Sequence, residues 1–132
     1  INVKRIEVEA DLPDNGLNVW ADSDSITQVL YNLTDNAVKF CPEGGRLWVR
    51  ARAEGGKARV TVGNTGPTIP PEELPLVFDR FHKMDKSRSV DRDGYGLGLY
   101  IVKTIVDSHG EDICVTSHEG KTEFSFTLPL KK

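Results

Sequence analysis

The stretch from Asp22 to Phe40 constrains the fold more than any other part of the sequence. Its apolar residues recur at the i, i+3, i+4 and i+7 spacing of an amphipathic helix that faces a core. These residues are Ile26, Val29, Leu30, Leu33, Ala37 and Phe40. Asp22 or Ser23 can cap the helix at its N-terminus, and Cys41-Pro42 ends the pattern. We therefore predict one long helix with a core-facing stripe.

The same stretch carries a second, polar stripe. Its four members, spaced at i, i+4, i+8 and i+11, are Gln28, Asn32, Asn36 and Lys39. At about 100° per residue they lie roughly a quarter to a third of a turn from the apolar stripe. The amide oxygens of Asn32 and Asn36 can bind a hydrated metal ion, and Lys39 can bind phosphate. Two surface amides placed there by chance would give the same pattern, so the helix alone does not decide.

The composition limits the possible classes of protein. The chain has 132 residues, enough for one domain with a core and too few for two. Its net charge of −3 gives no electrostatic reason to expect binding to nucleic acid or to an anionic membrane. No apolar run approaches the ~20 residues of a transmembrane helix. The strand-like start without an initiator Met predicts a piece of a longer protein. Cys41 and Cys114 lack metal-ligand spacing, which predicts reduced thiols in a cytosolic domain.

The other segments alternate between strand, turn and helix patterns. We predict strands, most of them paired through glycine-containing turns, over residues 3–10, 46–53, 57–63, 112–117 and 122–128. Helices are predicted over 72–81 and 97–109. The charged segment 83–95 has almost no apolar residues, which predicts a mobile loop. This order predicts an α+β fold, a two-layer α/β sandwich with about three helices on one face of a mixed, mainly antiparallel sheet.

Three glycines lie where the charged loop becomes a helix. Gly94, Gly96 and Gly98 follow one another at two-residue intervals. Glycine lets the backbone approach a ligand, and a helix N-terminus favours phosphate. The dinucleotide fingerprint does not fit, because a charged loop precedes the glycines and the third glycine comes too early. A flexible loop before a glycine-rich helix start remains the alternative interpretation.

A second turn, from Asn64 to Pro70, follows a predicted strand. The Asn64 carbonyl can accept a hydrogen bond from an exocyclic amine such as that of adenine. Gly66 frees the backbone, and Pro67 and Pro70 stiffen the exit from the turn. An ordinary turn with Asn and Gly is the alternative, and by itself the simpler interpretation.

Taken in order, these motifs resemble the ATP-binding catalytic domain of bacterial sensor histidine kinases, in the GHKL superfamily. QVLYNLTDNAVKF is similar to the N box of this family, NTGPTIP to the G1 box, LPLVFDRF to the F box and GYGLGLYIVKTIVDSHG to the G2 box. The resemblance covers nearly the whole chain. It implies a Bergerat-type ATP-binding fold over residues 1–132, with ATP and Mg²⁺ as cofactors. The chain resembles the type II topoisomerase, Hsp90-type and MutL-type ATPases less closely.

The resemblance also implies roles for individual residues. Asn36 would bind Mg²⁺ with Asn32 beside it, and Lys39 and Lys83 would contact the phosphates. Asn32, Lys39 and Lys83 would form the catalytic set. Residues 83–95 would form a lid over ATP. The remaining nucleotide-binding residues would be Phe40, Asn64, Gly66, Ile69, Phe81, Gly94, Tyr95, Gly96, Leu97, Gly98 and Leu99.

The sequence departs from the family pattern in four places. Asn64 stands where an Asp is usual, Thr68 replaces the second glycine of the G1 box, and Glu111 stands where a glycine is usual. The last hairpin lacks a further glycine near Lys121. None of these changes removes a phosphate or metal contact, so we expect ATP binding with moderate affinity.

The activity implied is transfer of the γ-phosphoryl group of Mg-ATP to a histidine in two-component signalling. The partners would be the dimerisation and histidine-phosphotransfer domain of the same protein and a cognate response regulator, with no nucleic acid and no direct membrane contact. His82, His109 and His118 match no acceptor motif and are expected to be surface or capping residues, so the acceptor is expected upstream of Ile1. The domain would belong on the cytoplasmic side of a membrane-anchored kinase.

Two other functions remain open. One is a serine kinase of the anti-sigma-factor type, which shares the fold. The other is a degenerate domain that binds nucleotide or a partner protein and regulates without transfer. The related ATPases carry a Glu at the position of Asn32, and an Asn cannot accept a proton as a general base. The sequence therefore favours transfer to a histidine over hydrolysis.

Overall fold

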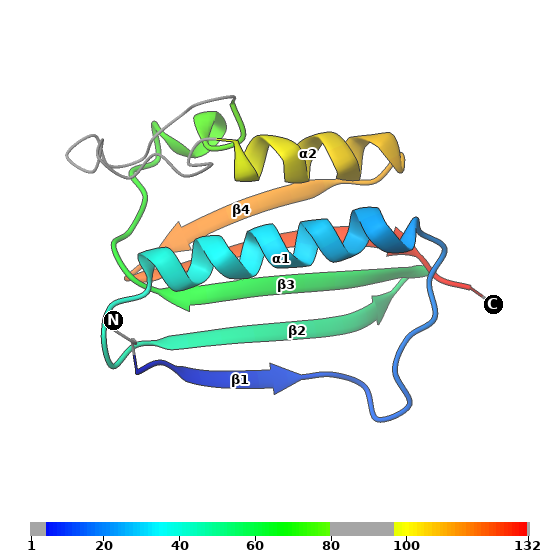
Figure 1. The fold of residues 1–132 in the computed structure, drawn as a ribbon, viewed down its shortest axis with the longest axis horizontal. Coiled ribbons are helices and arrows are strands. Elements are labelled where there is room, and N and C mark those ends of the chain that lie inside the picture. Colours follow the sequence, from blue (N-terminus) through cyan, green and yellow to red (C-terminus); the bar gives the residue numbers. More distant parts are fainter. Residues whose placement is uncertain (1–4, 80–96, 132) are drawn as a thin grey trace.

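The computed structural model describes residues 5–79 and 97–131. Two layers make up this part of the chain, a sheet and a pair of helices that lie on one of its faces (Figure 1). The elements, in chain order, are β1 (Glu7–Asp11), α1 (Ser23–Phe40), β2 (Arg46–Glu54), β3 (Lys57–Thr65), the 3-10 helix η1 (Leu74–Leu76), α2 (Gly98–Ser108), β4 (Ile113–His118) and β5 (Lys121–Pro129). The predicted α+β sandwich is confirmed.

The five-stranded sheet has the order β1-β2-β3-β5-β4. β1 runs parallel to β2, and the other neighbouring pairs are antiparallel. This arrangement confirms a mixed, mainly antiparallel sheet. A parallel neighbour needs a crossover connection, and α1 supplies it on the way from β1 to β2. The first strand is shorter than the predicted 3–10 and lies at the sheet edge.

The number of helices differs from the prediction. The described residues hold two α-helices and one short 3-10 helix, instead of about three helices. The helix expected over 72–81 is reduced to η1, which is built from i to i+3 hydrogen bonds such as Leu76 N–H to Glu73 O at 2.9 Å. Pro75 has no N–H to donate to the carbonyl of Pro71, as a regular α-helix beginning at residue 72 would require, so the described part of the segment stays in tight turns.

Helix α1 begins and ends where its capping residues predict. Asp22 Oδ2 accepts hydrogen bonds from Ser25 N at 3.0 Å and from Ser25 Oγ at 2.6 Å. Cys41 N–H closes the last turn on Ala37 O at 3.0 Å, and Pro42 prevents continuation. Within the predicted apolar stripe, Leu30 is 36% exposed and therefore lies at the rim of the core, not in it.

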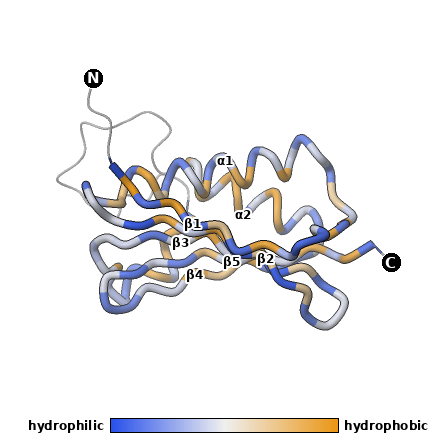
Figure 2. Tube along the Cα trace, turned by 90° about the horizontal axis from the view of Figure 1, so that it is seen from below, coloured by the Kyte–Doolittle hydropathy of each residue, from blue (hydrophilic) through white to orange (hydrophobic). Residues whose placement is uncertain are grey.

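The core fills the space between the helices and the sheet. Both helices lie on the same side of the sheet, as Figure 2 shows from a direction at right angles to Figure 1. Fully or nearly fully buried side chains from each layer are Val29, Leu33, Val102, Val106, Val62, Phe124, Phe126 and Leu128. Burying one such side chain contributes about 1.5–3 kcal/mol. The core thus fixes α1 and α2 side by side, which places the polar stripe of α1 beside the start of α2.

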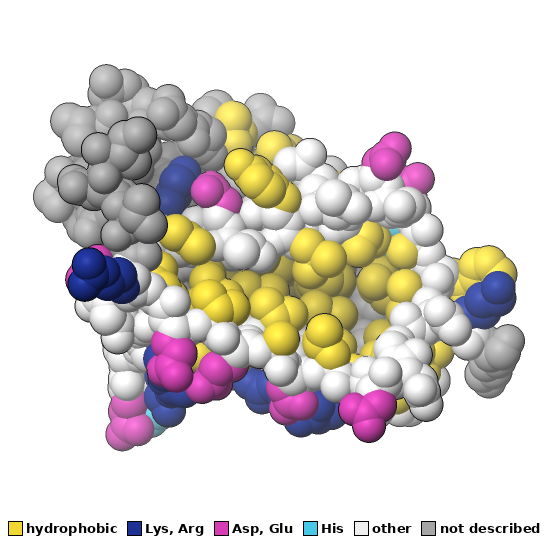
Figure 3. Space-filling view, turned by 60° about the horizontal axis from the view of Figure 1, so that its bottom comes forward, with side chains coloured by type: hydrophobic (Ala, Val, Ile, Leu, Met, Phe, Trp, Pro, Cys, Tyr) yellow, Lys and Arg dark blue, Asp and Glu magenta, His cyan; other side chains and the backbone are white. Residues whose placement is uncertain are grey.

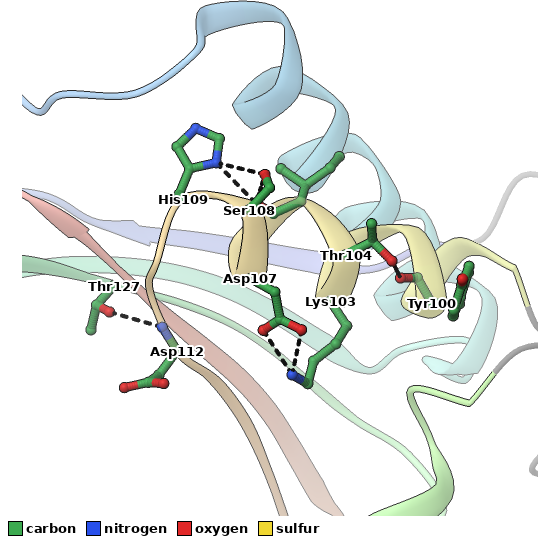
Figure 4. A network of polar contacts seen from close by, with 9 residues as sticks. Tyr100, Lys103, Thr104, Asp107, Ser108, His109, Asp112 and Thr127 are labelled. Carbon is green, nitrogen blue, oxygen red and sulfur yellow. Dashed lines mark hydrogen bonds and ion pairs between the residues drawn. The ribbon is translucent and has the colours of Figure 1, made fainter.

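The ends of the two helices are also tied by a histidine. His109 Nδ1 donates to Ile105 O at 2.9 Å, and Asp22 N–H donates to His109 Nε2 at 3.1 Å. Figure 4 shows His109 next to Ser108 at the end of α2. His109 therefore caps α2 and joins it to the start of α1, in agreement with the predicted capping role. Gly110 follows with φ 71°, as a residue just after a helix C-terminus often does.

The opposite face of the sheet is polar. Strand β2 places Arg46, Trp48, Arg50 and Arg52 alternately on this face, where a surface hollow of about 340 Å³ is lined by them and by residues of neighbouring strands. Glu123 accepts from both Trp48 Nε1 and Arg50 at 2.7 Å. These partners neutralise one another, which is typical of a solvated sheet face. At the β1 edge, by contrast, Figure 3 shows hydrophobic side chains gathered in a shallow depression.

Candidate functional site

The polar stripe of α1 meets the start of α2 through one side chain. Asn32 Nδ2 donates to Gly98 O at 3.3 Å, across 66 residues of sequence. Asn32 Oδ1 accepts from Gln28 Nε2 at 3.1 Å, one turn earlier on α1. The structure therefore brings together the asparagine-rich helix and the last of the three glycines, two motifs that the sequence only places in order.

Asn36 and Lys39 continue the stripe toward the C-terminal end of α1. Asn36 lies one turn beyond Asn32, about 6 Å along the helix axis, and is half-buried. Lys39 Nζ lies 3.3 Å from Asp35 Oδ2, an i,i+4 ion pair at the surface. A cation in the last turn also interacts favourably with the helix dipole. The stripe thus presents two amides and one cation in a row.

Asn64 is a buried amide at the end of β3. Its side chain is on the helix-facing side of β3, and the residue is only 3% exposed. Asn64 Nδ2 donates to Thr65 O at 2.8 Å, whereas Asn64 Oδ1 accepts no hydrogen bond from the described residues. A buried polar atom without a partner costs about 1–3 kcal/mol, so such atoms are uncommon and often belong to a ligand site.

Gly66 is fixed by the close approach of its backbone to the end of α1. A Cβ at this position would lie 2.5 Å from Phe40 O and 3.2 Å from Asn64 Nδ2. Gly66 N–H donates to Gly120 O at 2.9 Å, in the turn between β4 and β5. Phe40, Asn64 and Gly66, three of the residues predicted to bind nucleotide, therefore meet at one place.

The rest of this turn is anchored to the β4–β5 hairpin. Gly120 N–H donates to Thr68 Oγ1 at 2.7 Å, and Ile69 N–H donates to Ser117 Oγ at 2.8 Å. Ile69 is 8% exposed and belongs to the hydrophobic core. The threonine that replaces a glycine in this motif thus has a structural partner.

The start of α2 offers backbone donors. Leu97 is the N-cap residue, and no side chain among the described residues caps the helix. Gly98 is the first helical residue, and a Cβ there would meet no atom within 4 Å in residues 5–79 and 97–131. Leu99 is buried in the core at 8% exposure. The free N–H groups of a first helical turn favour an anion such as phosphate.

Several predicted site residues lie outside the described residues. They are Phe81, Lys83, Gly94, Tyr95 and Gly96, together with the proposed lid 83–95. The part of the candidate site that lies within the described residues therefore consists of the α1 stripe, the turn after β3 and the start of α2.

Three interacting residues were given no role from the sequence, two of them on α1 and one beyond the end of α2. Gln28 contacts Asn32, and Asp35 pairs with Lys39; the i,i+4 spacing of both pairs is a signal that could have revealed them. Glu111 is buried, and both of its carboxylate oxygens accept from Lys57 Nζ, at 2.7 and 2.6 Å. Lys57, and to a lesser degree Thr127, holds the pKa of Glu111 below its ordinary value by hydrogen bonding. No local pattern in the sequence pointed to this contact.

The donor set of the site suits a nucleotide with magnesium. Among the described residues, no three His, Cys, Asp or Glu side chains cluster as a metal cage would require. Magnesium needs no such cage, because it keeps several waters and binds one or two protein oxygens along with phosphates. The Asn32 and Asn36 amides, the start of α2 and the Asn64 oxygen can serve a metal, phosphates and a base amine respectively.

The helices of the described part are short or polar. None of them is long and apolar enough to cross a membrane.

Among curated relatives, the chain is similar to the sensor histidine kinase WalK of Bacillus subtilis. The two are 42% identical over 132 residues, which is 98% of this chain and 22% of WalK. The adaptive-response sensory kinase SasA of Synechococcus is 42% identical over 133 residues and is covered to 34%. The chain thus spans between about a fifth and a third of the length of these relatives.

Solved structures share the fold. The mycobacterial sensor histidine kinase MprB has a TM-score of 0.83 at 35% identity, with 96% of this chain and 84% of that chain covered. Full-length ShkA in complex with AMPPNP has a TM-score of 0.80 at 31% identity, covering 96% and 26%. ThkA in complex with the response regulator TrrA has a TM-score of 0.77 at 31% identity, covering 96% and 34%.

Residues 21–132, most of the chain, match one family. The match includes the polar stripe of α1, the turn after β3 and the start of α2. The chain belongs to the histidine kinase-, DNA gyrase B- and HSP90-like ATPase family, and within it is homologous to the ATP-binding domains of sensor histidine kinases.

Proposed function

We propose that this domain binds Mg-ATP and donates the γ-phosphoryl group to a histidine on a separate dimerisation and phosphotransfer domain. The observation that carries the proposal is the Asn32–Gly98 contact at 3.3 Å, because it joins the metal-binding amides of α1 to the phosphate-binding start of α2. Phosphoryl transfer depends mainly on positioning and on neutralising charge, and these two parts supply both.

Different residues of the chain would bind different parts of the nucleotide. Asn36, with Asn32 beside it, would hold Mg²⁺ through amide oxygens. Lys39 and the first-turn N–H groups of α2 would bind phosphate oxygens. Asn64 Oδ1, buried and without a partner among the described residues, would accept a hydrogen bond from the adenine amine. When bound, Mg²⁺ neutralises the charge that develops on the phosphates.

The acceptor is expected on another domain. In the transfer, a histidine nitrogen would form a bond to the γ-phosphorus while the bond to the β,γ-bridging oxygen breaks, leaving ADP. Both ring nitrogens of His109 are engaged in hydrogen bonds, so His109 is not free to attack. His118, the last residue of β4, lies beside Glu119, and both side chains are exposed. His82 lies outside the described residues.

The comparisons support this proposal at two points. ShkA, a structural neighbour, was solved with the nucleotide analogue AMPPNP, and ThkA was solved with a response regulator. By homology, we propose that the protein to which this domain belongs works with a response regulator in a two-component system.

Asn32 would also favour transfer over hydrolysis. An amide cannot take a proton from water, so it gives no general-base catalysis. We expect Asn32→Glu to raise the rate of ATP hydrolysis by the isolated domain. An unchanged rate, with nucleotide binding intact, would count against this role.

Two measurements test the proposed function. Calorimetry with Mg²⁺ and a non-hydrolysable ATP analogue should show binding to the wild-type domain, and Asn36→Ala should weaken that binding at least tenfold. Labelled ATP should then transfer its label to the phosphotransfer domain when both domains are mixed. Absence of heat at millimolar ligand would refute nucleotide binding. Binding without transfer would instead identify a regulatory module.

A further inference from the structure

Gln28 is the one member of the polar stripe that the proposed function leaves without a role. It lies one turn before Asn32 on α1, and its Nε2 donates to Asn32 Oδ1 at 3.1 Å. The simplest alternative is a solvated surface amide that touches its neighbour by chance. The other contact of Asn32 argues against this alternative.

The Asn32 amide makes two hydrogen bonds, one as a donor and one as an acceptor. Its Nδ2 faces Gly98 O at 3.3 Å, and a backbone carbonyl can only accept a hydrogen bond. The amide must therefore direct its NH₂ group to α2, which turns Oδ1 toward Gln28. The only group on Gln28 that can satisfy this oxygen is its own NH₂ group, which is the contact observed. The two hydrogen bonds thus select one amide orientation and one rotamer.

This arrangement leaves the function of Asn32 intact. A carbonyl oxygen has two lone pairs, and Gln28 uses one of them. The second remains for a metal-bound water or for the metal itself. Without Gln28, the Asn32 side chain would be held only by its 3.3 Å contact to Gly98 O, and other orientations would become populated.

We infer that Gln28 is a positioning residue, which fixes the amide of Asn32 for nucleotide-bound magnesium. The inference rests on the proposed function. A ligand that binds only one side-chain arrangement loses apparent affinity in proportion to the fraction of molecules in that arrangement. We therefore expect loss of the Gln28 donor to weaken binding of Mg-nucleotide by about threefold to tenfold.

The variant Gln28→Met tests this inference, because Met has a similar length, favours helix and donates no hydrogen bond. Thr27→Ala is the matched control: Thr27 lies next to Gln28 in the chain, is exposed, and donates to Ser23 O on the same helix. Calorimetry with Mg²⁺ and a non-hydrolysable ATP analogue should show the loss in Gln28→Met and not in Thr27→Ala. In an Asn32→Ala background, Gln28→Met should cause no further loss, because the two residues act as a unit.

A second readout needs no nucleotide. The side-chain NH₂ signals of Asn32 can be assigned by comparing nitrogen-15 spectra of the free wild-type domain and of Asn32→Ala. They are the NH₂ signals that are present in the first spectrum and absent from the second. Gln28→Met should change the chemical shifts of these signals and increase the mobility of the Asn32 side chain. Thr27→Ala should leave the chemical shifts unchanged.

The outcomes separate the two proposals. If the wild-type domain binds no Mg-nucleotide, the proposed function fails, and this inference fails with it. If the wild-type domain binds and Gln28→Met binds equally well, only the inference is overturned. The inference is also overturned if Gln28→Met lowers the affinity for Mg-nucleotide equally in the wild-type and Asn32→Ala backgrounds. Unchanged NH₂ signals of Asn32 in Gln28→Met would overturn it as well.

Discussion

The substitution Gly98→Ala, which adds one methyl group, tests whether Gly98 serves the stability of the fold or the binding of nucleotide. A Cβ built on Gly98 meets no heavy atom of the described residues within 4 Å, so Gly98→Ala clashes with none of them in the free domain. Gly98 is the first residue of α2, and Ala is favoured over Gly in helices by up to about 1 kcal/mol. We therefore expect the free energy of unfolding to rise by about 0.5–1 kcal/mol.

Nucleotide binding should change in the opposite direction. The proposed site uses the first-turn N–H groups of α2, and a phosphate that approaches this backbone would meet the new methyl group. We expect at least tenfold weaker binding, which corresponds to about 1.4 kcal/mol. Gly66→Ala is the contrasting variant, because its Cβ would lie 2.5 Å from Phe40 O, a backbone atom that cannot move alone. Overpacking of this kind costs about 1–3 kcal/mol, so Gly66→Ala should lose stability along with binding.

Urea unfolding followed by circular dichroism gives the stability of both variants, and calorimetry gives their affinity for a non-hydrolysable ATP analogue with Mg²⁺. A Gly98→Ala domain that is stable and binds like wild type would show that phosphate does not approach this backbone. A Gly98→Ala domain that is destabilised would contradict the open space seen at this position.

Three further changes have defined outcomes. Glu111→Gln should lower the unfolding free energy by about 2 kcal/mol at pH 7, because it removes charge-assisted bonds to Lys57. The pKa of Glu111 is lowered in the folded state, so its contribution is full above the unfolded pKa near 4.5 and is lost as pH falls through the folded pKa. Urea titrations from pH 7 to 3 should thus converge for wild type and variant. Glu119→Asn should stabilise the domain by about 0.5–1 kcal/mol in urea unfolding, since Glu119 has φ 50° in the β4–β5 turn. Asn64→Asp should destabilise the free domain, because a carboxylate cannot donate a hydrogen bond to Thr65 O. An ATP analogue should raise the melting temperature of this variant more than it raises that of the wild type.

The sequence was most informative where a single pattern decides the structure. The spacing of Val29, Leu33 and Ala37 predicts the buried stripe of α1, and all three are buried. The same pattern includes Leu30, which is at the rim because the core-facing stripe of α1 is narrower than the spacing suggests. The prediction of a helix over 72–81 was wrong because it took Pro71 as the start of a helix and gave no weight to Pro75, whose missing N–H decides the local structure.

Contacts between distant segments could not be read from the sequence. Asn32 and Gly98 are 66 residues apart, and their hydrogen bond exists because the core places α1 and α2 side by side. The meeting of Phe40 with Gly66 likewise depends on how α1 ends over β3. The sequence supplied the residue types of the site, and tertiary packing supplied their arrangement.

The residues that depart from the family pattern also acquire their contacts from tertiary packing. Thr68 accepts from Gly120 N–H at 2.7 Å, and Glu111 binds Lys57 and Thr127 from a buried position. Each of these side chains has its own structural partners, so neither needs a ligand to explain it. Asn64 differs, because its buried Oδ1 has no partner among the described residues. Of these three departures, Asn64 is therefore the one that we propose to affect binding, and we expect the affinity for adenine to depend on residue 64 far more than on residues 68 or 111.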